Sequence, residues 1–455
     1  MESTTILFPS RNLVTVEELE VLMNEDRGPI GLVVKELNLE QFSNFFSLVG
    51  KTESIKSLIM KDVRLGVRGA LRLNEALLSN KNITQLDVSS CGLGEEGIEV
   101  LSEGIAEQGD MEILCVDNNG IRTESAQHLT TALGSLNNLK ELSIAKNNFS
   151  AKGFEFVTNF LRKARLRVLN LRNNTISAKG VKTLAYIIKD NACHFDSGIE
   201  ELDMSKCKLT DTMANDLAQA IERNEYMKIL NLSSNSISST SAISKAVELS
   251  NIEEFVFDKN RLGYGSESAI INSILGRHNT HVRVLSLNDN NIQNVQDLSD
   301  ALADDTTLEI LKICGNQITD NDLLVESLIK NTTLKELHTN TMDSKNRHRI
   351  LKNRPTLQII TAEGDQPKRE VAISGFGTSQ SKKRVSKKTC SKETVSSSDD
   401  ESDGEEDHEL KSTGIKKSRA KKDEAPPKSS RSRKKIDQSE ESYLCISDSE
   451  EHISD

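Results

Sequence analysis

The sequence predicts an open α/β solenoid, in which parallel strands line one side of a curved stack and helices cover the other. Three observations predict this fold class. The pattern L-x-x-L-x-L-x-x-N/C-x-L recurs along the chain, the early copies lie 27 or 28 residues apart, and a helix-length stretch separates each copy from the next. Units of this kind bury their apolar faces only by stacking on one another.

Each copy contains a short strand, because its L-x-L alternation places aliphatic side chains on one face. Nine close copies span residues 83–93, 111–121, 139–149, 166–176, 199–209, 227–237, 252–262, 282–292 and 308–318. A looser copy covers 55–65, and a degenerate one covers 334–342. The second aliphatic residue of successive copies lies at 58, 86, 114, 142, 169, 202, 230, 255, 285, 311 and 337. We expect these residues to share one register in a parallel sheet.

A polar or thiol side chain follows each strand at the point where the chain turns. Such a side chain can bond backbone groups of its own turn and of the neighbouring coil. We expect a buried ladder formed by Cys91, Asn119, Asn147, Asn174, Cys207, Asn235, Asn260, Asn290 and Asn316. Cysteine at two of these positions indicates reduced, buried thiols and an intracellular compartment.

The stretches between strands have the periodicity of amphipathic helices. In residues 94–110, Ile98, Leu101 and Ile105 lie at i, i+3 and i+7 and form one apolar face. The repeat spacing widens to 33 between positions 169 and 202 and narrows to 25 between 230 and 255. This indicates an insertion near residues 189–198 and a shortened helix near residues 241–250.

The recurring motif resembles that of the leucine-rich repeat family, and the long period is similar to the ribonuclease-inhibitor-like subclass. The resemblance implies a horseshoe with the parallel sheet on its concave side and helices outside. We divide the chain into an N-terminal cap (1–54), the repeats (55–345), a C-terminal cap (346–364) and a tail (365–455). "GLVVKELNL", within the first cap, has the pattern of a degenerate strand.

Charge separates the repeats from the tail. Residues 1–364 contain 39 basic and 49 acidic residues, whereas residues 365–455 contain 19 and 20 in blocks, with few aliphatics. Such a tail cannot bury enough apolar surface to offset its ordering entropy, so we expect disorder. The first ten residues lack the basic and apolar regions of a signal peptide, and no apolar run reaches membrane-spanning length. We therefore expect neither secretion nor membrane insertion.

Acidic side chains dominate the strand positions that should face the concave surface. The predicted partner-binding residues are Asp87, Asp117, Glu141, Glu201, Asp203, Glu254 and Asp258. A surface of this charge should repel phosphate backbones, so we expect a protein partner with a basic patch rather than nucleic acid. The alternative is that these acids only solvate the surface.

Catalytic motifs are absent from the sequence, so we expect no enzyme, no cofactor and no metal. Gly50-Lys51-Thr52 matches the end of a phosphate-binding loop, but Phe45 replaces its first glycine. The cysteines form no C-x-x-C pair and no cluster with histidine at metal spacing. The period and layout also resemble the GTPase activators of Ran, which implies an alternative function with Arg64 or Arg68 as candidate arginines.

The tail contains basic clusters of the kind that nuclear import adaptors bind. The K-K-x-R form and a second cluster a dozen residues later resemble a bipartite signal. The residues are Lys416, Lys417, Arg419, Arg431, Arg433, Lys434 and Lys435. The alternative is a basic linker that contacts nucleic acid or nothing. Before these clusters, Ser396, Ser397, Ser398 and Ser402 each have an acid three residues on, a pattern typical of acidophilic kinase sites.

A short apolar run followed by acid interrupts the tail near its end. It consists of Tyr443, Leu444, Cys445 and Ile446, followed by Asp448 and Glu450. This run resembles a motif that binds the small ubiquitin-like modifier (SUMO), in which an extended segment adds a strand to a sheet edge. A chance apolar patch or another docking motif is the alternative. Together these features predict a non-enzymatic scaffold in the nucleus, or alternatively the cytoplasm.

Overall fold

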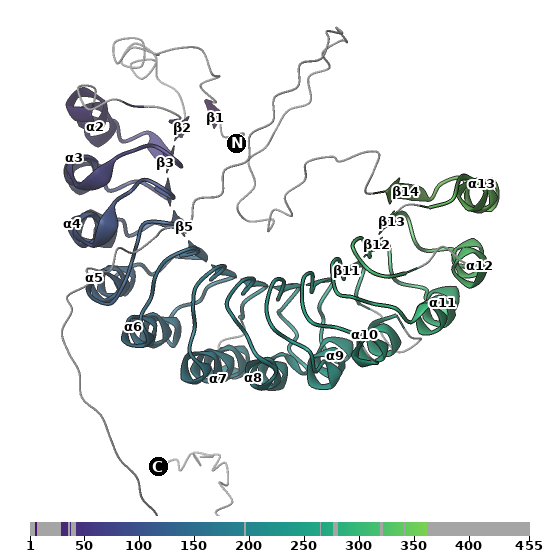
Figure 1. Cartoon of the computed structure of the whole chain (residues 1–455). Helices are drawn as coiled ribbons and strands as arrows, with labels where there is room; N and C mark the ends of the chain where they lie inside the picture. The colour runs from purple at the N-terminus through teal and green to yellow at the C-terminus, as the bar shows by residue number, and fades with distance from the viewer. Residues whose placement is uncertain are drawn as a thin grey trace, which may run out of the picture. The chain divides into compact units, whose positions relative to one another are not determined.

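The computed structural model describes residues 5–6, 29–34, 37, 42–194, 197–263, 265–275, 281–318, 322–340 and 342–361. From residue 29 onward these residues form an arc with strands along its inner side and helices along its outer side (Figure 1). The predicted fold class, an open α/β solenoid, is therefore confirmed. The predicted tail at 365–455, with its import and SUMO-binding residues, lies outside the described residues.

A single parallel sheet runs the length of the described part, with its fourteen strands in chain order. The strands are β1 (Thr5–Ile6), β2 (Ile30–Val33), β3 (Ile55–Ile59), β4 (Gln85–Asp87), β5 (Ile113–Cys115), β6 (Glu141–Ser143), β7 (Val168–Asn170), β8 (Glu201–Asp203), β9 (Ile229–Asn231), β10 (Glu254–Val256), β11 (Val284–Ser286), β12 (Ile310–Lys312), β13 (Glu336–Thr339) and β14 (Gln358–Thr361). Each strand pairs with the next one in sequence, so every coil of the chain advances the stack by one strand.

The strands align on their buried aliphatic residues, as the spacing predicted. Leu58, Leu86 and Leu114 are direct partners across β3, β4 and β5, and the same register continues to Leu337 in β13. These side chains are almost completely buried. Burying one leucine contributes ~1.5–3 kcal/mol, and each coil needs its neighbours to complete that burial.

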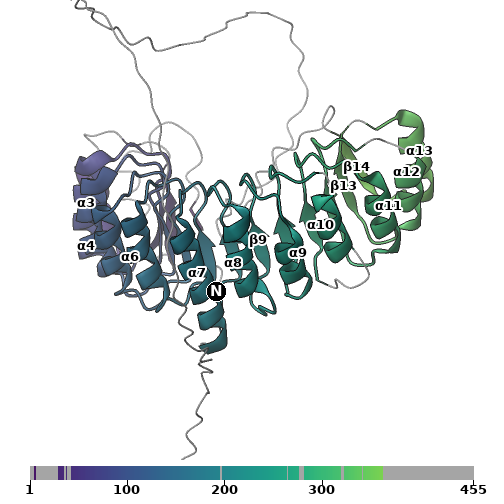
Figure 2. The same ribbon diagram turned by 60° about the horizontal axis from the view of Figure 1, so that its bottom comes forward.

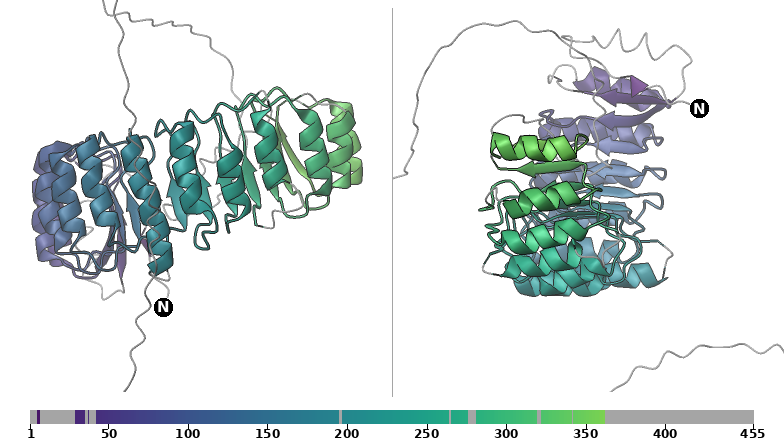
Figure 3. Two further views of the ribbon diagram at one scale, coloured as in Figure 1. Left: turned by 90° about the horizontal axis from the view of Figure 1, so that it is seen from below. Right: turned by 90° about the vertical axis from the view of Figure 1, so that its right-hand side faces the viewer.

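The helices form the outer layer, where they pack side by side (Figures 2 and 3). They are α2 (Phe42–Lys51), α3 (Gly66–Ser79), α4 (Gly94–Ala106), α5 (Glu124–Leu133), α6 (Ala151–Leu161), α7 (Ala178–His194), α8 (Asp211–Ile221), α9 (Ser241–Glu248), α10 (Ser266–Ile274), α11 (Val295–Asp304), α12 (Asp322–Lys330) and α13 (Ser344–Asn353). Helix α4 buries Ile98, Leu101 and Ile105, the face that the periodicity predicted.

The predicted ladder of asparagines and cysteines is present and joins adjacent coils. The Asn147 amide donates to the carbonyls of Val116 and Ile144 at 3.1 and 3.0 Å. Its Oδ1 accepts from the backbone N–H groups of Asn119 and Ile121 at 3.1 and 3.2 Å. One buried side chain thus satisfies backbone groups of two successive coils.

Cysteine replaces only the donor part of this hydrogen bonding, because a thiol is a weak donor and a weak acceptor. The Cys91 Sγ donates to the carbonyl of Met60 at 3.1 Å. The N–H of Leu65, in the preceding coil, instead donates to the backbone carbonyl of Cys91 at 3.0 Å. Burial raises the pKa of the Cys91 and Cys207 thiols to about 12, so both side chains are neutral.

The residue before each ladder position adopts the left-handed conformation. Its φ lies between 53° and 70° in all nine coils, although only Gly315 is a glycine. The left-handed conformation costs a non-glycine residue ~1–2 kcal/mol. It turns the chain out of the strand while its N–H still bonds the next coil, as when Lys146 donates to the Arg172 carbonyl at 2.7 Å.

Both ends of the described stack are covered by irregular coils. At the N-terminal end, α2 buries Phe42, Phe45, Phe46 and Val49. The Gly50-Lys51-Thr52 sequence lies at the end of this helix, where the Thr52 hydroxyl donates to the Leu48 carbonyl at 2.9 Å. Those three residues therefore terminate a capping helix rather than form a phosphate-binding loop. β2 occupies the degenerate strand pattern predicted there.

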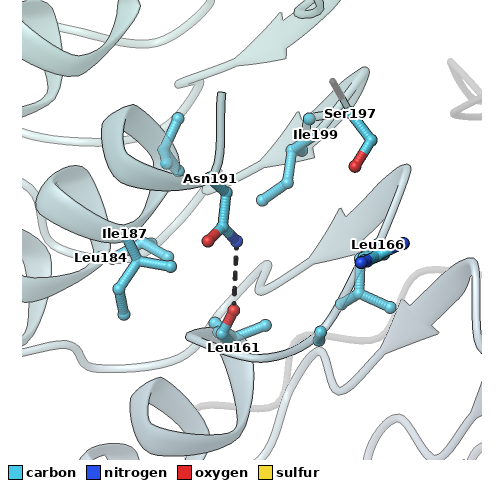
Figure 4. Close-up of a pocket in the computed structure, with 11 residues that line it drawn as sticks. Leu161, Leu166, Leu184, Ile187, Asn191, Ser197 and Ile199 are labelled. Carbon is cyan, nitrogen blue, oxygen red and sulfur yellow. Dashed lines mark hydrogen bonds between the residues drawn. The ribbon is translucent and has the colours of Figure 1, made fainter. Parts of the chain in front are cut away.

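The two spacing irregularities appear as helices of unequal length. α7 has 17 residues and α9 has eight, whereas α6 and α8 have eleven each. Where α7 lengthens, a cavity of about 10 Å³ lies beside it, lined by Leu161, Leu184 and Asn191 among others (Figure 4). The Asn191 amide donates to the Leu161 carbonyl at 3.2 Å across this space.

Removing a ladder asparagine should destabilise the fold strongly. Asn147→Ala leaves the N–H groups of Asn119 and Ile121 buried without their acceptor, so we expect the free energy of unfolding to fall by about 3 kcal/mol or more. Asn159→Ala, on the exposed face of α6, should change it by less than about 0.5 kcal/mol. Urea unfolding followed by circular dichroism measures both. Equal effects of the two substitutions would contradict the role of the ladder.

Candidate protein-binding surface

The concave surface is made from three outward positions in each coil and a fourth at its rim. From Glu112 onward the rim column alternates in charge, except where Lys140 is followed by Arg167. Lys140 pairs with Glu112 at 2.7 Å, and Arg167 pairs with Glu200 at 2.7 Å. The rim pairs continue with Lys228 and Glu253 at 3.5 Å, then Lys335 and Glu309 at 2.7 Å. Because these charges are already paired, the rim contributes little net field, and each exposed pair adds little stability.

The first outward position carries a row of glutamates on alternate strands. Glu141, Glu201 and Glu254 lie on β6, β8 and β10, and the sheet register places Val168 and Ile229 between them. All three are half-buried. Desolvation, followed by the charge of Glu201, raises the pKa of Glu141. Oε2 of Glu141 is buried, and no described group donates a hydrogen bond to it.

Two of the predicted aspartates bond their own turn. Oδ1 of Asp87 accepts from the Ser89 N–H at 2.9 Å, and Oδ1 of Asp203 accepts from the Ser205 N–H at 2.7 Å. Asp203 is 3% exposed, and burial raises the pKa of its carboxyl. Its carboxylate therefore has little surface left to offer a partner.

Two others bond the following coil. Oδ1 of Asp117 accepts from the Ser143 hydroxyl at 2.6 Å and from the Ala145 N–H at 2.7 Å. Oδ1 of Asp258 accepts from the Ser286 hydroxyl at 2.7 Å and from the Asn288 N–H at 2.8 Å. Burial raises the pKa of Asp117 to about 6 and also raises that of Asp258. These carboxylates join neighbouring coils of the solenoid.

The seven predicted residues thus divide into two groups. The three glutamates present carboxylates along one row, while the four aspartates accept hydrogen bonds from their own turn or from the following coil. A hollow of about 340 Å³ lies at the Glu201 and Glu254 end of the row, lined by Glu200, Glu201, Lys228, Ile229, Glu253, Glu254, Arg283, Val284 and Glu309. Its lining includes the aliphatic residues Ile229 and Val284, and glutamates outnumber the two basic residues.

The described residues contain no grouping of His, Cys, Asp and Glu that could hold a metal ion. The alternative arginines, Arg64 and Arg68, lie exposed between β3 and the first turn of α3. Within the described part of the chain, none of the helices combines the length and the apolar character that crossing a membrane requires.

A parallel sheet in chain order, an asparagine ladder and an outer layer of helices define the class of α/β solenoids built from strand–turn–helix coils. Four segments of the chain match the leucine-rich repeat family, at residues 79–102, 165–185, 223–244 and 278–295. The chain therefore contains leucine-rich repeats. Its resemblance to the ribonuclease-inhibitor-like subclass stays a prediction.

Two known proteins show partial similarity. NACHT, LRR and PYD domains-containing protein 9C of Mus musculus is 30% identical over 95 residues, which are 21% of this chain. The match spans 9% of the length of that relative. The crystal structure of an internalin C2 from Listeria monocytogenes aligns with a TM-score of 0.34 and 18% identity, covering 52% of this chain and 84% of the internalin.

The buried carboxyl of Asp117 should make stability depend on pH. Its pKa of about 6 exceeds the value of ~3.9 in an unfolded chain. The folded protein therefore binds this proton more tightly, and the contribution of Asp117 to stability falls as pH rises from 4 through 6. Asp117→Asn keeps the Oδ1 acceptor and removes the charge. We expect it to raise the free energy of unfolding at pH 7.5 by on the order of 1 kcal/mol.

Urea unfolding at pH 5 and pH 7.5 measures this effect, and the gain should shrink at the lower pH. Glu225→Gln removes the same charge from an exposed position outside the concave face and serves as the control. A pH dependence that is identical in the wild type and in Asp117→Asn would show that Asp117 does not titrate in this range.

Proposed function

We propose that this protein is a non-enzymatic nuclear scaffold that binds a basic protein partner on its concave surface. Leucine-rich repeat proteins generally mediate protein–protein interaction, and their fold is typically a non-enzymatic scaffold. The single observation that carries the proposal is the row of Glu141, Glu201 and Glu254 on alternate strands, of which Glu201 and Glu254 line a hollow together with aliphatic side chains.

The row is suited to lysine or arginine side chains that enter from above. Strands two apart in a sheet are separated by ~9.5 Å, so the glutamates present regularly spaced charges. Their partial burial strengthens an ion pair relative to one in open water. The unsatisfied Oε2 of Glu141 supports this reading, because a guanidinium or ammonium donor would complete it.

The tail supplies the second part of the proposal. The basic clusters at Lys416–Arg419 and Arg431–Lys435 would direct nuclear import, and the run at Tyr443–Ile446 would dock SUMO. The sequence composition supports these roles: an extended segment can place ammonium groups in acidic pockets and can add a strand to an exposed sheet edge. A scaffold built this way would join a repeat-bound partner to SUMO-carrying proteins.

Neutralising the glutamate row should remove the concave partner. We expect Glu141→Gln/Glu201→Gln/Glu254→Gln to lower the capture of basic nuclear proteins at least tenfold, because each lost charge pair weakens binding. The control, Glu96→Gln/Glu222→Gln/Glu225→Gln, changes net charge equally on exposed positions outside the sheet. Quantitative mass spectrometry of captured proteins measures both, followed by calorimetry with each purified candidate. Loss of the same proteins in both variants would refute a concave site.

The SUMO prediction is tested separately with the full chain. Leu444→Ala/Ile446→Ala should abolish binding of purified SUMO, because alternate apolar side chains fill the partner's pockets in this mode of recognition. The Glu141→Gln/Glu201→Gln/Glu254→Gln variant should bind SUMO as tightly as the wild type. Calorimetry that detects no SUMO binding to the wild-type chain would contradict the prediction.

A further inference from the structure

One segment of the repeats carries a strong local excess of basic residues. Residues 151–194 contain nine Lys and Arg residues and two acidic residues, whereas residues 1–364 as a whole are acidic. The segment comprises α6, β7 and α7. Two of its basic residues, Arg167 and Arg172, lie on the coil of β7, and Arg167 pairs with Glu200 at the rim. The other basic residues belong to the helices and to the turn after α6.

The two helices lie side by side on the outer side of the arc (Figure 2). α7 buries Val181, Leu184 and Ile188 against the core. Its opposite face carries an exposed stripe at i, i+3, i+7 and i+10. The stripe consists of Lys179, Lys182, Tyr186 and Lys189. α6 and the turn after it add exposed Lys152, Arg162 and Lys163. We call these seven residues the convex basic patch.

Few carboxylates compensate this charge. Lys179 pairs with Glu155 at 2.7 Å. Within the described residues, Lys152, Lys163, Lys182 and Lys189 form no salt bridge, although most coils of the solenoid pair a lysine or arginine with a neighbouring carboxylate. Unpaired like charges on adjacent helices repel one another, and an anionic partner would relieve that repulsion.

An exposed aromatic ring lies within the patch. Tyr186 is 58% exposed. The other large apolar side chains that are exposed among the described residues are leucines. The guanidinium carbon of Arg162, from the turn after α6, lies 5.7 Å from the centre of its ring. This cation–π contact joins the two helices and holds a cation beside the ring.

We propose that the convex basic patch binds single-stranded nucleic acid, with phosphates on the lysines and a base against Tyr186. Stacking on an aromatic side chain within a basic surface is a common mode of single-strand binding. A lysine-rich surface is unusual for the core of a protein–protein interface, where lysine is depleted. Lys179 and Lys189 are ten residues apart, about 15 Å along the helix, which spans a few nucleotides. Because contacts to phosphates and to the face of a base carry little sequence information, we expect little sequence preference.

This site is separate from the acidic concave row, which should repel the same ligand. The patch would let one molecule hold a basic protein on its inner face and a nucleic acid on its outer face. The concave proposal can therefore fail without affecting this one.

Fluorescence anisotropy of a labelled oligo(dT) 20-mer with the full chain, from 50 to 200 mM NaCl, tests the proposal. Single-strand binding has a slope of log K against log salt of about −0.7 per phosphate contact, so Lys182→Gln/Lys189→Gln should reduce the slope by about 1.4. Tyr186→Ala should weaken binding by about 5- to 150-fold, the range for loss of one stacked base.

Two controls separate the patch from general charge effects. Lys245→Gln/Lys330→Gln makes the same net charge change on α9 and α12 and should leave the slope unchanged. Every protein compared contains the basic tail, so any nucleic-acid binding by the tail is the same in all of them. Thermal unfolding checks that the exposed substitutions leave the fold intact. No binding at 50 mM NaCl, or equal slopes for the patch and control variants, would overturn the proposal.

A competition experiment distinguishes nucleic acid from an acidic protein. Poly-glutamate of matched charge should displace the oligonucleotide from the wild type only at much higher concentration, because it offers no base to stack. If poly-glutamate competes equally well and Tyr186→Ala binds as tightly as the wild type, the surface takes acidic peptides and the proposal is wrong.

Discussion

The bonding of each coil to the next through buried polar groups is the constraint on which the structure depends. A coil has a three-residue strand and a short helix, and neither would persist alone. The asparagine ladder solves the main difficulty, because the turn after each strand leaves backbone groups inside the stack. Asn147 satisfies groups of its own coil and of the coil before it. The left-handed residue before each ladder position extends these bonds beyond the strand, at a cost in backbone strain.

Charged side chains are distributed differently on the rim, the concave face and the convex face of the stack. Rim charges pair across coils and cancel, the concave glutamates lie between aliphatic residues, and the convex lysines of α6 and α7 are largely uncompensated. The aspartates show that carboxylates on the same face differ in how many hydrogen bonds they accept from the solenoid itself. Asp117 and Asp258 face the same surface as the glutamates, yet both accept hydrogen bonds from the next coil. Their carboxylates serve cohesion first.

Much of the fold could be predicted from periodicity. The leucines of the motif share one register, the ladder residues are buried, and the lengthened α7 and shortened α9 lie at the predicted irregularities. Sequence spacing could not separate Asp203, which is buried, from Glu201, which is half-buried, because both point to the same side of β8. That difference arises because the Ser205 N–H, from the following turn, and the Asn231 amide, from strand β9, both donate to the Asp203 carboxylate. The convex basic patch was missed although residues 151–194 signal it, because charge summed over all repeats hides a local excess.

The strict strand-by-strand order also determines how such a molecule tolerates change in length. Every coil is an equivalent wedge, so gaining or losing a whole one would shift everything beyond it by one strand spacing, ~4.8 Å, with a small rotation. Gaining or losing a single residue within a strand would instead turn a leucine outward and break the register. Evolution along this chain should therefore proceed in whole modules or in helix-side loops. The five extra residues between β7 and β8 fit that rule, since they extend α7 and leave the strands aligned.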